Sequence, residues 1–323
     1  MKRIPLKIIV SISILPFCIL SSYGQQRPQY TQYMVNNYLF NPAVTGINDN
    51  ISVKAGYRTQ WVGFDDAPKT YFLSIHGPVN KIDDRFIRKK VHHQGIGGYI
   101  FNDVTGPTSR TGLYLSYAYH LSLTKKVKFS MGAFAGLLQT KVDADKITLT
   151  NPNDNAVLFG IQSRFLPDIS FGIWIYTDKT FFGVSMSQVI QNRIFESPET
   201  TIAAFSKLNN HYFLHGGYNF RLNRDWSLVP SVLLKAVKPT YSHFDINLKV
   251  KYKANAWAGL SYRDDDAIAA MIGFASMKSG FNLSYSYDLT TSKIRLHSAG
   301  SHEIVVGYNF PSKGKVLCPE DFW

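Results

Sequence analysis

Apolar and polar side chains alternate along repeated segments of about ten residues from one end of the chain to the other. The clearest segment places five apolar side chains opposite five polar ones: Phe244, Ile246, Leu248, Val250 and Tyr252 against Asp245, Asn247, Lys249, Lys251 and Lys253. A period of two is that of a β-strand whose two faces meet different surroundings. No segment of comparable length shows helical spacing, so the pattern predicts an all-β protein.

Fourteen such runs predict strands near residues 51–59, 69–77, 94–103, 110–121, 126–139, 168–176, 179–188, 211–221, 225–237, 242–252, 255–263, 267–276, 280–289 and 302–310. Together they cover about half of the chain, well above the roughly 20–25% strand content of ordinary domains. Their number is even and their lengths match tilted strands that cross a membrane. We therefore expect one antiparallel transmembrane β-barrel.

The connections between runs test this expectation independently. Bacterial outer-membrane barrels have short periplasmic turns and longer outer loops. Short links follow even-numbered runs, at 122–125, 177–178, 222–224, 253–254 and 277–279, whereas long ones follow odd-numbered runs, at 60–67, 140–167, 189–210 and 290–301. The alternative is a soluble β-sandwich or propeller. The barrel is favoured because the apolar face carries aromatic residues near strand ends, as interfacial girdles do: Tyr252, Tyr262, Phe274, Tyr308 and Phe310.

The first 24 residues read as a secretory signal peptide. Lys2, Arg3 and Lys7 precede an uncharged apolar run, and the small residues Ser22 and Gly24 favour cleavage near Gly24. Pro16 and Phe17 stand where lipoprotein processing before Cys18 needs small side chains. The predicted organisation is a signal peptide (1–24), a periplasmic or lumenal segment (25–50), the barrel (51–310) and a tail (311–323). Residues 25–50 are too aromatic for a solvated tail, and we expect them to pack inside the barrel.

Composition agrees with this assignment. Only 18% of residues are charged, 14% are aromatic and the mean hydropathy is −0.11, as expected for a chain with a lipid face, a polar lumen and aromatic rims. Two cysteines exclude a disulfide framework and a cysteine-rich zinc site. The net charge of +13 raises the possibility of nucleic acid, but part of it lies in the leader and in one connection, which favours anionic protein or lipid contacts instead.

Candidate chemistry is sparse. His92 and His93 are adjacent and point opposite ways in extended chain, so a metal site is disfavoured. The run 264–266 is either a carboxylate cation site or, as we favour, a solvated turn. Five Ser and His side chains could serve as a nucleophile or a base, because they face the lumen or begin the last strand: Ser185, Ser187, His211, His215 and His302. Their spacing does not indicate a catalytic triad. We expect no enzyme, no metal and no cofactor.

Two other groups are candidate functional residues. The connection after the second run breaks the short-turn rule and carries basic and aromatic residues suited to a periplasmic partner: Arg85, Phe86, Arg88, Lys89 and Lys90. The tail ends in Phe322 and Trp323, which are further candidates for partner contact. Inward-facing positions of the first and last two runs carry Lys54, Arg58, Asp288 and Glu303. Because those strands become neighbours when a barrel closes, we predict an ionic network at the seam.

The ordered motifs of the chain resemble the PorP/SprF outer-membrane proteins of type IX secretion and gliding motility in Bacteroidetes. They span nearly the whole mature chain and include Gln29-Tyr30-Thr31-Gln32-Tyr33-Met34, Asn41-Pro42-Ala43, Arg58-Thr59-Gln60-Trp61-Val62-Gly63, Ala67-Pro68-Lys69-Thr70, Leu115-Ser116-Tyr117-Ala118-Tyr119-His120, Leu260-Ser261-Tyr262-Arg263, Tyr285-Ser286-Tyr287-Asp288 and Ser301-His302-Glu303-Ile304.

This resemblance implies a fatty-acid-transporter-like barrel without catalytic activity. It implies that the protein helps export, or hold at the cell surface, a cognate protein with a C-terminal sorting domain. Other secretion subunits, periplasmic lipoproteins and outer-membrane lipid are the remaining expected partners, and nucleic acid is not. The alternative function is a passive transporter or porin for a small solute, and a lipid-modifying barrel enzyme is a third, weaker hypothesis.

Overall fold

The computed structural model describes residues 27–79, 92–147, 161–194, 207–237, 242–253, 255–276 and 279–310. Its strands are β1 (Ile51–Thr59), β2 (Lys69–Pro78), β3 (His92–Thr105), β4 (Thr108–Ser122), β5 (Lys128–Asp143), β6 (Ile161–Tyr176), β7 (Thr180–Ser187), β8 (His211–Tyr218), β9 (Phe220–Arg221), β10 (Trp226–Val237), β11 (His243–Tyr252), β12 (Ala256–Arg263), β13 (Ala267–Ala275), β14 (Phe281–Thr290) and β15 (Ser301–Phe310). Short 3-10 helices are η1 (Asn37–Leu39), η2 (Pro42–Val44), η3 (Ala144–Lys146) and η5 (Lys293–Leu296). Within these ranges no helix is long and apolar enough to cross a membrane.

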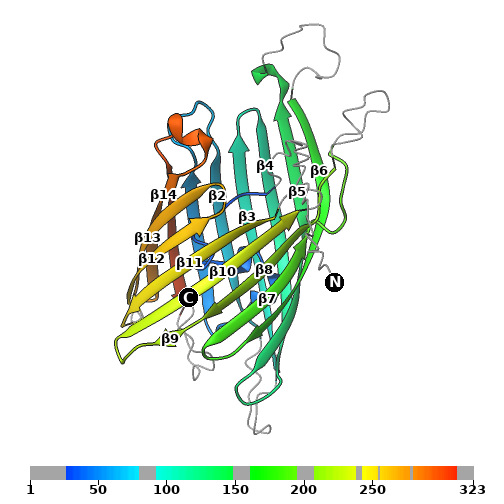
Figure 1. The fold of residues 1–323 in the computed structure, drawn as a ribbon. Helices are drawn as coiled ribbons and strands as arrows, with labels where there is room; N and C mark the ends of the chain where they lie inside the picture. The colour runs from blue at the N-terminus through cyan, green and yellow to red at the C-terminus, as the bar shows by residue number, and fades with distance from the viewer. Residues whose placement is uncertain are drawn as a thin grey trace, which may run out of the picture.

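The strands form one closed antiparallel barrel (Figure 1). Apart from β8 and β9, each strand pairs with the next along the chain, and β15 pairs with β1 from Ile51↔Phe310 to Thr59↔His302, which joins the two ends of the sheet. β8 and β9 are two pieces of one wall strand, interrupted at Asn219, because both pair with β10. The wall therefore has the fourteen strand positions that the alternation predicted, and the expectation of a fourteen-strand barrel is confirmed.

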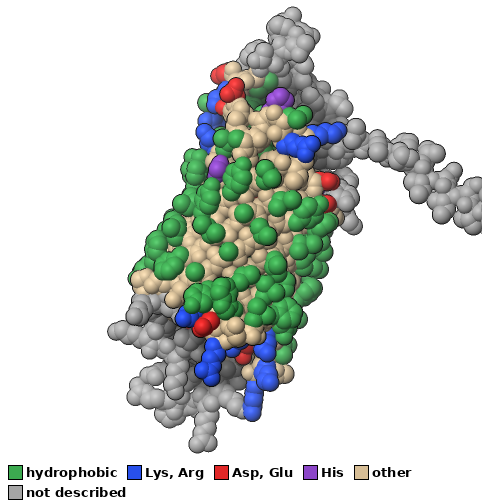
Figure 2. Space-filling view, turned by 60° about the vertical axis from the view of Figure 1, so that its left-hand side comes forward, with side chains coloured by type: hydrophobic (Ala, Val, Ile, Leu, Met, Phe, Trp, Pro, Cys, Tyr) green, Lys and Arg blue, Asp and Glu red, His purple; other side chains and the backbone are tan. Residues whose placement is uncertain are grey.

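The alternation separates a lipid-facing surface from a polar lumen. On β11, Asp245, Asn247 and Lys249 are buried, while Ile246 and Leu248 are exposed on the outside. The same division recurs around the wall, and Figure 2 shows hydrophobic side chains covering its side while charged ones gather toward its two ends. Such a surface is costly in water but matches hydrocarbon, so the exterior is that of an outer-membrane barrel.

The two ends of the barrel differ in their connections. β1 begins at one end, where the connections after β4, β6 and β9 are short, as in 123–127 and 177–179. By the general rule for outer-membrane barrels this is the periplasmic end. The opposite end, called here the outer end, carries the long connections 60–68, 144–160 and 188–210. Side chains near Ile51 and Tyr252 therefore belong to the periplasmic end, and those near Thr59 and His243 to the outer end.

Strands β5 and β6 extend further than the sequence pattern predicted. β6 begins at Ile161 rather than near residue 168, and the β5–β6 register runs on to Asp143↔Ile161. Pro167, which cannot donate a ladder hydrogen bond, lies within this extension of β6. β6 pairs with β7 only from Phe171 onward, so Pro167 lies where β6 has a partner on the β5 side alone. An edge position of this kind tolerates proline.

Candidate functional site

The lumen is filled by the chain's own N-terminal region, residues 30–47, called here the lumenal segment. It lies inside the ring of strands in Figure 1 as the dark blue trace. Its apolar side chains are buried among those of the wall: Tyr30, Tyr33, Met34, Tyr38, Leu39, Phe40, Ala43, Val44 and Ile47. At the height of the lumenal segment, the described part of the lumen is therefore packed with side chains rather than open.

Asn41 fixes the conformation of the lumenal segment and attaches it to the wall. Its Oδ1 accepts from the Ala43 N–H at 2.9 Å and so caps η2, whose first residue is Pro42. Its Nδ2 lies 3.0 Å from the Ile173 carbonyl of β6 and 3.2 Å from the Val184 carbonyl of β7. A single buried amide therefore joins the helix cap to two neighbouring strands.

Wall hydroxyls satisfy backbone carbonyls of the lumenal segment. Ser185 Oγ donates to the Phe40 carbonyl at 2.7 Å, and Ser130 Oγ donates to the Ala43 carbonyl at 2.8 Å. These carbonyls lie in 3-10 turns and irregular chain, where few intrasegment bonds are available. Short polar side chains on the inner face of β5 and β7 thus replace the water that the lumen excludes.

Tyr38 is the central aromatic anchor of the segment. Its ring stacks on that of His76 with 4.4 Å between centroids and meets Phe134 edge-on at 5.3 Å, and its hydroxyl lies 2.8 Å from Ser116 Oγ. Burial raises the pKa of the Tyr38 phenol, so the hydroxyl stays protonated and remains able to donate. Both the ring and the polar tip of the side chain have partners on the wall.

Three histidines on β2, β3 and β4 hold the end of the lumenal segment near the periplasmic end. His120 Nε2 donates to the Thr45 carbonyl at 2.8 Å, His93 Nε2 donates to the Gly46 carbonyl at 3.1 Å, and the Gly46 N–H donates to His76 Nδ1 at 3.2 Å. His93 and His120 stack with centroids 4.2 Å apart.

The His92-His93 pair is therefore divided between two surroundings. His92 is exposed, while His93 turns inward to the lumenal segment. The described residues contain no group of three or more His, Cys, Asp or Glu side chains arranged to hold a metal ion.

Glycines on the inner wall allow the lumenal segment to approach the backbone of the strands. A Cβ at Gly132 would lie 2.5 Å from the Pro42 carbonyl oxygen, and one at Gly95 would lie 2.1 Å from the Thr45 carbonyl oxygen. In each case the nearest atoms are backbone, which has no rotamer to change. The fit between segment and wall depends on these missing side chains.

Charged side chains gather at the seam near the outer end. Arg58 lies 2.9 Å from Asp288 and 3.3 Å from Glu303, and all three are buried. Thr31 of the lumenal segment joins them, because its N–H donates to Glu303 at 2.7 Å and its hydroxyl donates to Asp288 at 2.6 Å. The cluster therefore connects β1, β14 and β15 to the segment that fills the lumen.

Arg263 belongs to the same cluster, although the sequence interpretation missed it. It lies 3.4 Å from Asp288, 2.8 Å from Asp266 and 3.6 Å from Asp245. The sequence did carry a signal for this residue, because alternate positions of β12 share a face and this places Arg263 on the same inner face as Trp257. Asp266, the last residue of the run 264–266, closes the β12–β13 turn by binding Arg263.

The inclusion of Lys54 in the seam network was wrong. Lys54 does face the lumen, but its Nζ donates to the Val35 carbonyl of the lumenal segment, and the structure gives it no ion pair with Asp288 or Glu303. Along β1 it lies four positions nearer the periplasmic end than Arg58, about 13 Å away at the rise of a strand. The prediction that Lys54 faces the lumen was correct. Its position along the barrel axis, however, separates it from the carboxylates.

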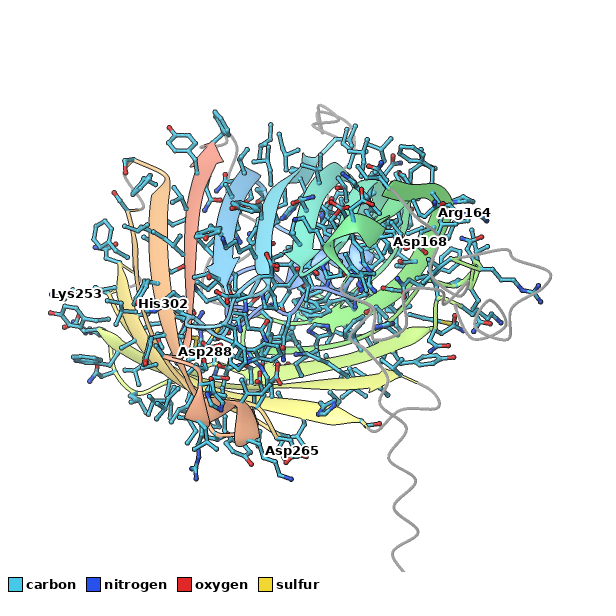
Figure 3. All side chains as sticks on the ribbon, turned by 90° about the horizontal axis from the view of Figure 1, so that it is seen from above. Arg164, Asp168, Lys253, Asp265, Asp288 and His302 are labelled. Carbon is cyan, nitrogen blue, oxygen red and sulfur yellow. The ribbon has the colours of Figure 1, made fainter. Side chains whose placement is uncertain are left out.

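Three of the five candidate nucleophiles and bases, Ser185, His211 and His302, have other hydrogen-bond partners. Ser185 binds the Phe40 carbonyl, and His302 points outward, where its Nδ1 lies 2.7 Å from the Tyr285 hydroxyl. His211 contacts the Asn209 carbonyl at 3.1 Å. Viewed from above, side chains fill the ring and Asp168 and Asp288 lie inside it, whereas Lys253 stands at its edge (Figure 3). Asp168 accepts from the Tyr114 hydroxyl at 2.7 Å, so this carboxylate too has a structural partner.

The proposed partner-binding residues Arg85, Phe86, Arg88, Lys89 and Lys90, with Phe322 and Trp323, lie outside the described residues, as do the signal peptide and the tail.

Among solved structures, the fold is similar to three bacterial proteins. The toluene transporter TodX of P. putida has a TM-score of 0.51 at 10% identity, with 85% of this chain and 93% of that chain covered. The CymD monoaromatic hydrocarbon channel gives 0.47 at 12% identity, covering 87% and 92% of the two chains. A FadL homologue of Pseudomonas aeruginosa gives 0.46 at 10%, covering 88% and 94%. At these identities the TodX likeness supports the barrel fold alone.

No curated protein matches the sequence. The family model described as "Type IX secretion system membrane protein PorP/SprF" matches residues 22–308, which include the lumenal segment and almost the whole barrel. The resemblance seen in the ordered motifs is thereby confirmed, and the chain belongs to the PorP/SprF family of type IX secretion system membrane proteins.

Proposed function

We propose that this protein is a non-enzymatic outer-membrane barrel that helps export a cognate protein with a C-terminal sorting domain, or helps attach that protein to the cell surface. In this role it contacts other secretion or gliding-machinery subunits or periplasmic lipoproteins, after its leader is removed near Gly24. Membership of a secretion-system family supports the setting. The observation that carries the proposal is the filled lumen, because a barrel packed with its own chain suits a binding platform.

The packing of the lumenal segment spans the lumen. Asn36 Nδ2 donates to Ser74 of β2 at 3.1 Å, Asn41 reaches β6 and β7, and the Tyr33 hydroxyl lies 3.3 Å from Ser231 of β10. A segment tied to walls on several sides obstructs passive flow of solute. It also leaves the rims and connections as the surfaces on which partners dock.

Capture from the native outer membrane tests the proposal. We expect the tagged full-length protein to recover a surface protein with a type IX sorting domain, or secretion subunits. Recovery of neither from membranes that contain both would contradict the proposed role. Charge reversal at Arg88, Lys89 and Lys90 is expected to reduce recovery of periplasmic partners. Charge reversal at Lys125 and Lys126, exposed in the next periplasmic turn, is the matched control and is expected to leave recovery unchanged.

The alternative is a passive transporter for a small solute. Planar-bilayer recording separates the two functions, because the filled lumen predicts little steady current from the pure protein. Steady open-channel current from the wild-type protein would favour the transporter.

A further inference from the structure

The outer part of β6 has a neighbouring strand on one side only. β5 pairs with the whole strand, Ile161–Tyr176, whereas β7 pairs with it only from Phe171 onward. The chain that follows β7 forms two further hydrogen bonds with β6, to the carbonyls of Ile169 and Pro167. Nearer the outer end than Pro167, no described residue pairs with β6 on this side. We call residues 161–165 the free edge.

Every second residue of the free edge turns its main-chain groups away from β5. In a strand, the N–H and C=O of one residue point to the same side, and that side alternates along the chain. The carbonyls of Ile169 and Pro167 point away from β5, because they accept hydrogen bonds from the chain beyond β7. The β5–β6 register is unbroken, so the residues of the same parity do likewise: Phe165, Ser163 and Ile161. Pro167 agrees with this, since its missing N–H lies on the side without a strand.

The free edge therefore presents three N–H groups and three carbonyls in one row. Ile161 and Phe165 are four positions apart, about 13 Å along the strand. Main-chain groups arranged in this way are a template for pairing with another extended chain.

The outward side chains of β3 to β6 place the free edge outside the hydrocarbon. The outward row level with Pro167 is apolar: Ile100, Leu113 and Leu137. The next two rows toward the outer end, level with Phe165 and Ser163, are mostly polar: Asn102, Thr111 and Gln139, then Ser109 and Lys141. Hydrogen bonds join polar neighbours across the strands, as between Gln139 Nε2 and Ser163 Oγ at 2.9 Å. Unpaired main-chain groups are costly in lipid, and this change in polarity places them beyond it.

The outer face of the free edge is apolar despite this polar surrounding. The side chain of Phe165 is 67% exposed and that of Ile161 is 58% exposed, with Ser163 between them. Natural edge strands are commonly protected from pairing by charged side chains, and the outward positions of the free edge carry none. Exposed apolar side chains beside unpaired main-chain groups are typical of an interaction surface.

The position of the free edge restricts what can occupy it. The edge continues the wall of the barrel and lies above the shorter β7, which ends at Ser187. A second copy in the same membrane stands beside the barrel, so it cannot bring its own β6 into this position over β7. Lipid cannot supply a row of main-chain donors and acceptors. A polypeptide segment outside the membrane can do so.

We propose that the free edge binds an extended segment of the exported partner, which adds to β6 as a further strand at the outer end. Main-chain hydrogen bonds with Ile161, Ser163 and Phe165 supply affinity. Apolar side chains at alternate positions of the segment pack against Ile161 and Phe165, because alternate side chains of neighbouring strands share a face. This site deepens the proposed function, on which it rests only for the source of the segment.

Binding of a model strand to the purified full-length protein in detergent tests the site. The probe is a fluorescein-labelled peptide of alternating threonine and valine, flanked by lysines for solubility. Fluorescence anisotropy is expected to show saturable binding. Ser163→Pro removes an N–H from the free edge without removing a hydrogen bond to β5, and it is expected to weaken binding about tenfold. Residue-resolved hydrogen exchange should show the amides of Ser163 and Phe165 becoming protected when the peptide binds.

Ser163→Ala is the matched control, because it removes the same hydroxyl, which accepts from Gln139, but keeps the N–H. It is expected to leave binding within about twofold. Heat-modifiability on SDS gels shows whether each variant is folded. Ile161→Pro removes another N–H of the free edge, at the first position of β6, and keeps the test decisive if Ser163→Pro does not fold.

Absence of peptide binding, or equal weakening by Ser163→Ala and Ser163→Pro, would overturn the proposal. Protection of the Ser163 and Phe165 amides in the protein alone would also overturn it, because the edge would then already be paired. Dimerisation of the wild-type protein that Ser163→Pro abolishes would overturn it in favour of a second copy. Failure to capture a partner from native membranes, with peptide binding intact, would instead count against the proposed function.

Discussion

The guanidinium of Arg58 lies 2.9 Å from the Asp288 carboxylate and 3.3 Å from that of Glu303. One side chain of the first strand therefore binds a carboxylate on each of the last two strands. The contact crosses the seam where the barrel closes, and neither carboxylate is near Arg58 in sequence. Thr31 adds the lumenal segment to the same cluster. Closure of the wall and filling of the lumen therefore share one set of buried charges.

Glu303→Ala is expected to destabilise the barrel by about 3–5 kcal/mol, because it removes one of the two carboxylates bound to the buried Arg58 and leaves the buried N–H groups of Thr31 and Gln32 without their acceptor. Urea unfolding in detergent micelles measures the change in the free energy of unfolding. Asp225→Ala is the control, since Asp225 pairs with Lys253 at 4.0 Å with both side chains about half exposed. We expect that change to cost less than about 1 kcal/mol. Equal stability of Glu303→Ala and the wild type would disprove a structural role for the cluster.

Gly132→Ala is expected to displace the lumenal segment without unfolding the wall. The added Cβ would lie 2.5 Å from the Pro42 carbonyl oxygen and 2.8 Å from the Ala43 nitrogen, so the segment has to move. Planar-bilayer recording should then show steady current that the wild-type protein lacks, because a fourteen-strand lumen is wide enough for water once emptied.

Gly216→Ala is the control for this change, since the nearest atom to its added Cβ is 3.8 Å away. It is expected to leave conductance at the wild-type level. If Gly132→Ala kept both the wild-type conductance and the wild-type protection of the lumenal segment from protease, packing of the segment would not depend on the close approach at Gly132.

Asn41→Ala is expected to loosen the lumenal segment locally. It removes the η2 cap and two hydrogen bonds to the wall, and it leaves the Ile173 and Val184 carbonyls without this donor. Loss of a cap costs about 1 kcal/mol and each unsatisfied buried group about 1–3 kcal/mol. Hydrogen exchange at residues 38–46 should therefore become faster by about tenfold or more. Asn223→Ala, which removes only an exposed turn cap, should not change exchange there.

The strands could be predicted from the sequence because their signal is local. A lipid face and a polar lumen impose the same alternation on every wall strand, and all fourteen runs correspond to strand positions. Strand boundaries were harder to predict, because the sequence does not show where a strand lacks a partner on one side. β6 begins at Ile161 rather than near residue 168, and it has no β7 partner at Pro167, where proline is tolerated.

Contacts inside the lumen could be predicted only as far as parity and strand order determine them. Arg58, Asp288 and Glu303 are inward-facing and on neighbouring strands, so their proximity follows from closure. Lys54 shares this parity but lies at another height, because the register that places Arg58 opposite Glu303 places Lys54 opposite Gly307, and no local pattern in the sequence reveals that register. The place of Arg263 depends in addition on Thr31, which reaches the cluster through a segment with no regular secondary structure there.

Leu115→Arg tests the lipid face of the barrel. Leu115 lies at the middle of β4 with 69% of its surface exposed, which in a membrane means contact with hydrocarbon. Arginine at the midplane of an outer-membrane barrel costs about 2–4 kcal/mol, whereas near an interface the cost falls to about 0–1 kcal/mol. Leu123→Arg is the matched control, because Leu123 is similarly exposed but follows β4 at the periplasmic end. Unfolding in lipid bilayers should separate the two variants by about 2 kcal/mol or more. Equal losses in the free energy of unfolding would mean that the midpoint of β4 does not lie at the membrane centre. In detergent micelles, which have no defined membrane depth, the difference between the two variants should be smaller.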